Sequence, residues 1–397
     1  MITRTFQKLL VVLASLLFNM VCHAAKLPTD LHTQLLYVAP GYSVYTAHGH
    51  CALRMQCPSL HLDYCFTYGL DDNSQSYLKF LSGKGLGNYS VVYTKDYLDD
   101  YKKHNRKVLA YNLNLNLSEQ RNLWAFLDNE ISTPPYRRYD YLRSNCSSMC
   151  VYAVESILDN EHIEYSNLPT VLNGTYREYI RHISIHKPWI FFIWTTVLGA
   201  DGEEKGTLED KLSPSLLVQA WRDASFIDTT GAFRPVFVGS SQLLVKGDDG
   251  SRETFLTPCL VFSVLLLLIL TLCIVSIKTR HYGLAKAVES VILVSQTVAG
   301  LFLCYMTFIS KLPGTSGNLY VLAFNPLPAV IWLLFRRKEW YGRCVFLYAV
   351  FLIILITATP FVPQFDFEHA LLESSMLIVC VEAFLRLSNK RQLILAK

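Results

Sequence analysis

Hydrophobic and polar positions divide the chain into three parts. One apolar run covers residues 9–21, and a long stretch of mixed polar and apolar positions follows it. Five more apolar runs come after about residue 256, at roughly 258–277, 288–310, 319–335, 345–361 and 370–387. A helix needs about 17 to 25 apolar residues to span a bilayer, so the third and fourth runs are near the lower limit. The pattern predicts a globular domain over 25–252 and a membrane domain of about five helices over 256–397.

The first apolar run has the features of a secretory signal. Arg4 and Lys8 precede it and Cys22-His-Ala24 follows it, which is the usual order of charged, apolar and cleavage-site regions. A first transmembrane anchor is the alternative, but the run is shorter than the roughly 20 residues that a span needs. We therefore expect residues 1–24 to be a signal peptide, cleaved after Ala24, and the globular domain to be exported.

Charges beside the apolar runs are distributed asymmetrically. Basic residues accompany the ends of the first, third and fifth runs: Lys278, Arg280, Lys286, Arg336, Arg337, Lys338, Arg343, Arg386, Lys390 and Arg391. The other connections hold only Lys311, Asp366 and Glu368. Because cytoplasmic loops carry the excess of Lys and Arg, this distribution places the globular domain outside and the C-terminus in the cytoplasm. An odd number of spans agrees with an exported domain behind a cleaved signal.

Composition narrows the possible partners. Hydrophobic residues make up 51% of the chain and charged residues 17%, and the net charge of +4 includes no basic stripe with interleaved aromatics. Nucleic acid is therefore excluded as an expected partner.

Of the 11 cysteines, five lie in the exported part, so at least one thiol there stays unpaired. Apart from Cys146, the exported cysteines are Cys51, Cys57, Cys65 and Cys150. These four could form up to two disulfides, of which Cys57–Cys65 would close the shortest loop, or they could all be unpaired. No pair has zinc-finger spacing, so we expect no metal and no cofactor.

The exported part mixes strand and helix patterns, which is typical of an α+β domain. Runs of β-prone residues predict strands at 44–55, 63–68, 89–94 and 108–115. Helices are expected at 75–81 and 118–130, the second capped by Ser118 and stopped by Pro134-Pro135.

Cys146 lies where a loop is expected to become a helix. Asn145 is a good N-cap, and Cys146, Met149 and Cys150 follow helical spacing. A thiol in the first turn of a helix experiences the positive end of the helix dipole, which lowers its pKa. A histidine on a neighbouring strand would complete an activated nucleophile. The alternative is a small buried core residue, as free cysteines often are.

Four motifs occur in order along the exported part: Thr46-Ala-His-Gly-His-Cys-Ala-Leu-Arg54, Asp63-Tyr-Cys-Phe-Thr-Tyr-Gly69, Phe80-Leu-Ser-Gly83 and Tyr141-Leu-Arg-Ser-Asn-Cys146. This combination resembles the N-terminal periplasmic domain of the bacterial lipoprotein N-acyltransferase family Lnb. The resemblance continues through Thr175-Tyr-Arg177, Leu198-Gly-Ala-Asp201 and Leu212-Ser-Pro-Ser-Leu-Leu217, and into the membrane region at Ser310 and 318–327. It implies a permuted papain-like (NlpC/P60-like) fold, in which the histidine precedes the cysteine.

The resemblance also implies roles for residues. The family's Gly-His-x-Ala-Leu-Arg motif makes His50 the base, and its Asn-Cys motif makes Cys146 the nucleophile. Its Tyr-Asn-Tyr-Gly motif reads Phe66-Thr-Tyr-Gly69 here, so a hydroxyl replaces an amide at Thr67. The residue that orients His50 stays open among Asp63, which we include with the catalytic residues, His61 and Thr67.

Four residues are candidates for substrate binding: Asn145, Arg54, Thr67 and His48. Arg54 suits either an anionic headgroup or a structural ion pair. His48 stands where the family usually has an aromatic residue, and on a continuous strand it would share a face with His50.

The implied reaction is an acyl transfer at the bacterial inner membrane. A membrane phospholipid would donate an acyl chain to Cys146, and the α-amino group of a diacylglyceryl-cysteine at a lipoprotein N-terminus would accept it. Two other functions remain open: a membrane-anchored cell-wall amidase or peptidase of the NlpC/P60 type, and a non-catalytic envelope sensor or scaffold.

Three apolar or membrane-region features have two interpretations each. The aromatic segment 188–199 is too short to span, so it is either a buried core segment or an interfacial patch that guides lipid toward Cys146. Asn318, Asn325 and Pro326 either shape a helix entry or line a lipid path. Glu289 and Glu382 are expected near the cytoplasmic interface, where snorkelling rather than function is the simpler explanation.

Overall fold

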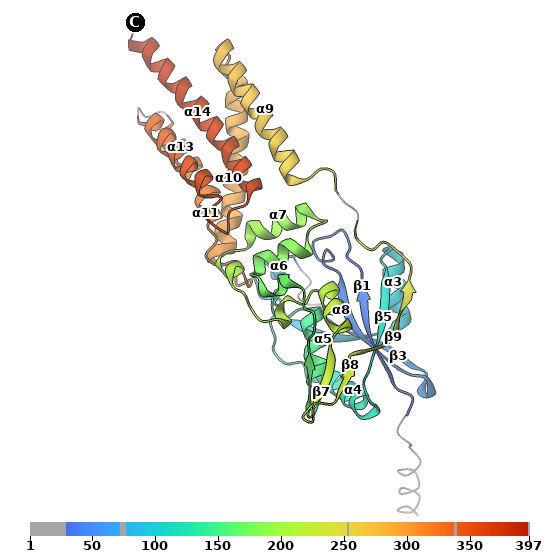
Figure 1. Ribbon diagram of the computed structural model, residues 1–397. Coiled ribbons are helices and arrows are strands. Elements are labelled where there is room, and N and C mark those ends of the chain that lie inside the picture. Colours follow the sequence, from blue (N-terminus) through green and yellow to red (C-terminus); the bar gives the residue numbers. More distant parts are fainter. Residues whose placement is uncertain (1–28, 72–76, 252–253, 337–339, 396–397) are drawn as a thin grey trace, which may run out of the picture.

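The computed structural model describes residues 29–71, 77–251, 254–336 and 340–395. A sheet-rich N-terminal domain is followed by an elongated bundle of helices that extends away from it (Figure 1). The expected signal peptide, 1–24, lies outside the described residues. The α+β class and the order of the two domains are as the sequence predicts.

One six-stranded antiparallel sheet organises the N-terminal domain, in the order β4-β3-β2-β1-β5-β9. Its strands are β1 (His32–Val38), β2 (His50–Cys57), β3 (Leu62–Leu70), β4 (Gly87–Tyr93), β5 (Val108–Leu113) and β9 (Phe237–Val245). A second sheet joins β6 (Glu161–Glu164), β7 (Ser225–Asp228) and β8 (Phe233–Pro235). The central position of β2 buries it on both faces.

Helices cover both faces of the larger sheet. On one face, Cys51, Leu53 and Met55 of β2 pack in a core with α4 (Leu117–Ser132), α5 (Cys146–Glu155), α6 (Tyr176–Ile183) and α8 (Pro214–Arg222). On the other face, Ala52 packs in a smaller cluster with Tyr97 of α3 (Thr94–Lys103). The remaining helical elements of this domain are α2 (Tyr77–Leu81), α7 (Pro188–Val197), η1 (Pro58–Leu60), η3 (Thr170–Asn173), η4 (Ala200–Glu203) and η5 (Glu209–Lys211).

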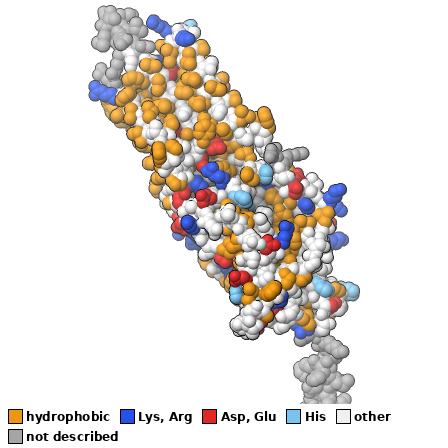
Figure 2. Space-filling view, in the orientation of Figure 1, with side chains coloured by type: hydrophobic (Ala, Val, Ile, Leu, Met, Phe, Trp, Pro, Cys, Tyr) orange, Lys and Arg blue, Asp and Glu red, His pale blue; other side chains and the backbone are white. Residues whose placement is uncertain are grey.

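The C-terminal part consists of helices α9 (Pro258–Thr279), α10 (Gly283–Phe308), α11 (Tyr320–Ala323), α12 (Leu327–Phe335), α13 (Tyr341–Ala358) and α14 (Phe367–Leu395). In the described residues, three helices are long and apolar enough to cross a membrane: α9, α10 and α13. Hydrophobic side chains cover the visible face of this bundle (Figure 2).

Two of the five predicted spans differ from simple membrane helices. The third predicted run is divided into α11 and α12, and the Asn325 side chain accepts a hydrogen bond from the Leu327 N–H at 3.0 Å. Asn325 and Pro326 therefore shape the start of α12. The fifth run lies in α14, a 29-residue helix that also carries buried Glu373 and Glu382. Arg386 forms ion pairs with Glu289 and Glu382. The carboxylates of Glu289 and Glu382 are therefore paired inside the bundle.

Close backbone contacts join the two domains. The segment after α10 lies against the N-terminal domain, because Lys311 N–H donates to Ser82 C=O at 3.0 Å and Gly199 N–H donates to Gly314 C=O at 2.7 Å. A Cβ atom at Gly83 would lie 2.0 Å from the Lys311 carbonyl carbon, so only glycine permits this approach. The N-terminal domain is thus held in a defined position on the end of the bundle.

Candidate active site

Helix α5 positions Cys146 at its first residue. The Asn145 side chain accepts hydrogen bonds from the N–H groups of Ser147 at 2.9 Å and Ser148 at 3.2 Å. The Ser148 hydroxyl accepts in return from the Asn145 N–H at 2.9 Å, which completes a capping box. The cap predicted from the sequence is present. Asn145 is buried and engaged in this cap, so it positions the cysteine rather than facing an open site.

His50 reaches the same region from the first position of β2. Its Cα is paired with that of Val38 in β1, and Gly49 before it has a positive φ of 86°. The His50 Nε2 atom lies 2.6 Å from the Thr67 hydroxyl oxygen on the adjacent strand β3. Of the three candidates for orienting the imidazole, Thr67 is therefore the one whose side chain contacts it.

Cys146 and His50 interact directly. Burial alone raises the pKa of the Cys146 thiol, but the His50 charge and a hydrogen bond to the imidazole outweigh it and lower the pKa below its ordinary value. Hydrogen bonds from the Cys51 backbone N–H and the Ser147 hydroxyl act in the same direction. The combined effect favours a thiolate, the nucleophilic form of cysteine.

The other thiols near this site are of a different kind. Burial raises the pKa of Cys51 and of Cys150 well above the ordinary value, and the charge of Cys146 adds to the effect. Each stays protonated beside the reactive thiol. Every cysteine in the described part of the chain is free, so the structure contains none of the disulfides that remained possible from sequence.

The structure does not bring Asp63 to His50. Arg54 donates to both carboxylate oxygens of Asp63, at 2.8 and 2.6 Å, and Thr94 donates at 2.5 Å. Although burial opposes it, hydrogen bonding by Arg54 and Thr94 lowers the pKa of Asp63. The expectation that Asp63 holds the imidazole is wrong, because the β2–β3 register places it opposite Gln56, well along the strand from His50.

Arg54 and His61 are also placed away from the dyad. Arg54 forms the ion pair with Asp63 and donates to the Gln34 side chain at 3.0 Å, which corresponds to the structural alternative for this residue. His61 is exposed at the turn between β2 and β3, at the opposite end of the hairpin from His50.

His48 serves a separate buried network. It precedes β2, and the positive φ of Gly49 interrupts the strand, so His48 and His50 do not share a strand face as expected. The His48 ring nitrogens contact the Tyr141 hydroxyl and, at 2.8 Å, the Ser184 hydroxyl. Burial lowers the pKa of His48 to about 3, so it is neutral. The network stabilises the loop before Cys146 through Tyr141. No local sequence signal indicated this contact.

A cavity of about 530 Å³ opens beside His50 and Thr67. Its wall includes Tyr45 and residues from β3 and β4. One carboxylate oxygen of Asp71, at its rim, is buried without a hydrogen-bond partner in the structure described. The cavity gives a substrate access to the imidazole side of the dyad.

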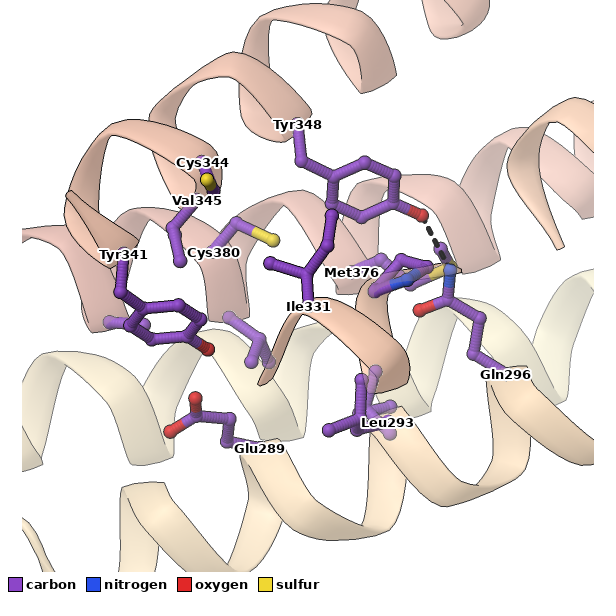
Figure 3. A pocket seen from close by; sticks show the side chains of 14 residues that line it. Glu289, Leu293, Gln296, Ile331, Tyr341, Cys344, Val345, Tyr348, Met376 and Cys380 are labelled. Carbon is purple, nitrogen blue, oxygen red and sulfur yellow. Dashed lines mark hydrogen bonds between the residues drawn. The ribbon is translucent and has the colours of Figure 1, made fainter. Parts of the chain in front are cut away.

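A smaller cavity of about 70 Å³ lies within the helical bundle (Figure 3). Glu289, Gln296, Tyr341 and Tyr348 contribute its polar groups, and the Gln296 amide donates to the Tyr348 hydroxyl at 2.5 Å. Cys344 and Cys380 line it, but none of the lining residues that the structure describes is a histidine, the usual base beside an activated thiol. Among the described residues, no group of three His, Cys, Asp or Glu side chains forms a metal site.

Two family models match the chain in succession. The model of the Lnb N-terminal periplasmic domain matches residues 23–181, and that of the Lnb transmembrane domain matches residues 250–391. Together they cover most of the chain, including Cys146, His50 and Thr67. Searches of curated proteins and of solved structures found no match.

Proposed function

Because the chain belongs to the Lnb family, with a periplasmic N-terminal domain attached to a transmembrane domain, we propose that it is a cysteine-dependent lipoprotein N-acyltransferase. It moves a fatty acyl chain from a membrane phospholipid, through a thioester on Cys146, to the α-amino group of an N-terminal diacylglyceryl-cysteine. The observation that carries the proposal is the lowered pKa of a helix-start thiol beside an imidazole that Thr67 orients. The protein lies in the bacterial inner membrane with its C-terminus in the cytoplasm.

The first half of the reaction forms the acyl-enzyme. His50 accepts the Cys146 proton, and the thiolate attacks the ester carbonyl carbon of the phospholipid. The tetrahedral intermediate then breaks its bond to the glycerol oxygen, and His50 returns the proton to that oxygen as lysophospholipid leaves. With Nε2 held by Thr67, the opposite ring nitrogen, Nδ1, serves the thiol.

The second half consumes the thioester. The acceptor amine attacks the thioester carbonyl, His50 removes a proton from the attacking nitrogen, and the Cys146 thiolate leaves as the amide forms. A thiol is suited to this sequence because its thioester reacts readily with amines.

The backbone N–H of Cys146, at the start of α5, stabilises the oxyanion in both halves of the reaction. Asn145 already accepts hydrogen bonds from Ser147 and Ser148, which leaves the Cys146 N–H as the first helical amide for the developing charge. The positive end of the helix dipole acts in the same direction.

Mass spectrometry of lipoproteins from cells carrying Cys146→Ser or His50→Ala tests the proposal. We expect loss of the N-linked acyl chain in both variants while the diacylglyceryl group remains. Altered cell-wall muropeptides with intact N-acylation would instead indicate an amidase, and wild-type behaviour of both variants would remove the catalytic assignment.

A further inference from the structure

A second cavity beside the dyad lies between the two domains. It has a volume of about 230 Å³, and α2, α7 and α10 contribute most of its wall. Of the residues that the structure describes, none with a charged side chain lines it. Aromatic and aliphatic side chains dominate its wall, among them Phe80, Ile193, Trp194, Phe302 and Met306. Such a wall suits the hydrocarbon of an acyl chain, because burying a polar group without a hydrogen bond is unfavourable.

The cavity is continuous with the apolar surface of the bundle. Phe302 and Met306 lie near the end of α10, a helix able to span a membrane, and Phe302 is 40% exposed. Helix α7 crosses the same end of the bundle (Figure 1), where Phe192 contacts Phe262 of α9 with ring centroids 5.1 Å apart. Aromatic side chains at this depth are typical of the membrane–water interface.

The opposite side of the cavity adjoins the dyad by two contacts. The rings of Phe80 and Tyr45 meet edge to face with centroids 5.7 Å apart, and Tyr45 also lines the cavity at His50. Trp194 stacks on Tyr141 at 4.3 Å, and the Tyr141 carbonyl accepts a hydrogen bond from the Asn145 side chain at 3.2 Å. The apolar cavity and the catalytic site are therefore neighbours, linked by the Tyr45–Phe80 and Trp194–Tyr141 contacts.

We propose that this apolar cavity binds an acyl chain of the donor phospholipid and sets the chain length that the enzyme prefers. The inference rests on the proposed function and adds where the donor binds. The chain enters from the outer leaflet past Phe302 and lies along α7, and its ester reaches Cys146 beyond the Tyr45–Phe80 contact. Each methylene of the chain that is buried against the apolar wall should increase the binding constant about fourfold.

The test measures the acyl-enzyme half-reaction alone, so that only the donor takes part. Full-length protein in lipid nanodiscs receives phosphatidylethanolamines with saturated chains of increasing length, and intact-protein mass spectrometry follows acylation of Cys146. Ile193→Trp and Val44→Trp each fill the cavity from a different wall. We expect each to lower the long-chain to short-chain rate ratio by about tenfold or more, equivalent to losing contact with about two methylenes.

Val298→Trp is the matched control, because Val298 lies on α10, is 64% exposed and does not line the cavity. It should keep the wild-type ratio. The ratio within one variant separates a filled cavity from a damaged fold, since misfolding lowers both rates. Photo-crosslinking of a diazirine-acyl phosphatidylethanolamine to Cys146→Ser protein should label α7 and α10.

Four outcomes would overturn the inference. An unchanged rate ratio in both cavity variants, or crosslinks only outside α7 and α10, would refute the acyl-chain site. The proposed function would still stand if the wild-type protein were acylated on Cys146. An effect confined to transfer from Cys146 to the acceptor would assign the cavity to the acceptor's chains instead. Absence of any acyl-enzyme in wild-type protein would reject the proposed function, and this inference with it.

Discussion

Replacing Thr67 with valine removes the hydroxyl that lies 2.6 Å from His50 Nε2 and keeps the side-chain shape. We assign Thr67 a positioning role, in which its oxygen accepts a hydrogen bond from Nε2–H and stabilises the imidazolium that forms when Cys146 ionises. A hydrogen bond to a charged group contributes about 1.5 to 3 kcal/mol. Converted at about 1.4 kcal/mol per factor of ten, its loss should slow acylation of Cys146 by roughly 10- to 150-fold.

The assay is the acyl-enzyme half-reaction followed by intact mass over a range of pH. Because the variant holds the imidazolium less well, the Cys146 pKa should rise and the acidic limb of the rate profile should move to higher pH. A purely structural role for Thr67 would lower the rate without moving this limb. Circular dichroism and thermal unfolding of each variant serve as fold controls.

Two conservative variants sharpen the result. Thr67→Ser keeps the hydroxyl and should retain most of the activity. Thr67→Asn introduces the amide of the family motif and should recover the rate relative to valine. A Thr67→Val protein with a wild-type rate and an unmoved pH profile would refute the reasoning.

Three further changes test neighbouring parts of the site. His50→Ala should raise the Cys146 pKa, because the charge and the hydrogen bond that lower it are lost. Alkylation of Cys146 by iodoacetamide near pH 7 should therefore slow. An unchanged pH dependence of alkylation would contradict the Cys146–His50 dyad. Asp63→Asn should leave acylation nearly unchanged but destabilise the fold by about 1 kcal/mol through the weakened Arg54 pair. The lowered pKa of Asp63 makes this contribution present above about pH 4 and lost below it, so unfolding of wild type and variant should converge in acid. Burial lowers the pKa of His48 to about 3, so His48 is protonated in the unfolded chain but not in the folded one near pH 5. The free energy of unfolding should therefore fall by about 2 kcal/mol between pH 7 and pH 5. His48→Gln should reduce that loss, which urea unfolding at the two pH values will measure.

The position of Cys146 at a helix start could be predicted from the sequence because the signals for that start are local. Asn145 and the helical spacing after it determine where α5 begins, and the structure has the cap and the helix as expected. The partner of His50 depends instead on strand register. Asp63 and Thr67 both lie on β3, but pairing of Ala52 with Thr67 brings only the latter beside His50.

Other differences also arise from contacts distant in sequence. The predicted strand over 44–55 starts only at His50, because a turn closed by the Ser43–Thr46 contact and the positive φ of Gly49 precede it. Residues 188–197 form α7, in which Ile190, Trp194 and Thr195 are buried. These side chains fit the expected core segment, and guidance of lipid toward Cys146 stays a prediction. The approach of Gly83 to Lys311 joins residues that no local pattern connects.

The most direct test of the central claim is the mass of the enzyme after incubation with phospholipid and no acceptor. We expect a single added acyl mass on the Cys146 peptide. Neutral hydroxylamine should remove it, and it should be transferred to a synthetic diacylglyceryl-cysteinyl peptide when that acceptor is added. Cys146→Ser protein should lack the hydroxylamine-labile adduct. N-acylation of the acceptor by Cys146→Ser protein at the wild-type rate would contradict the account.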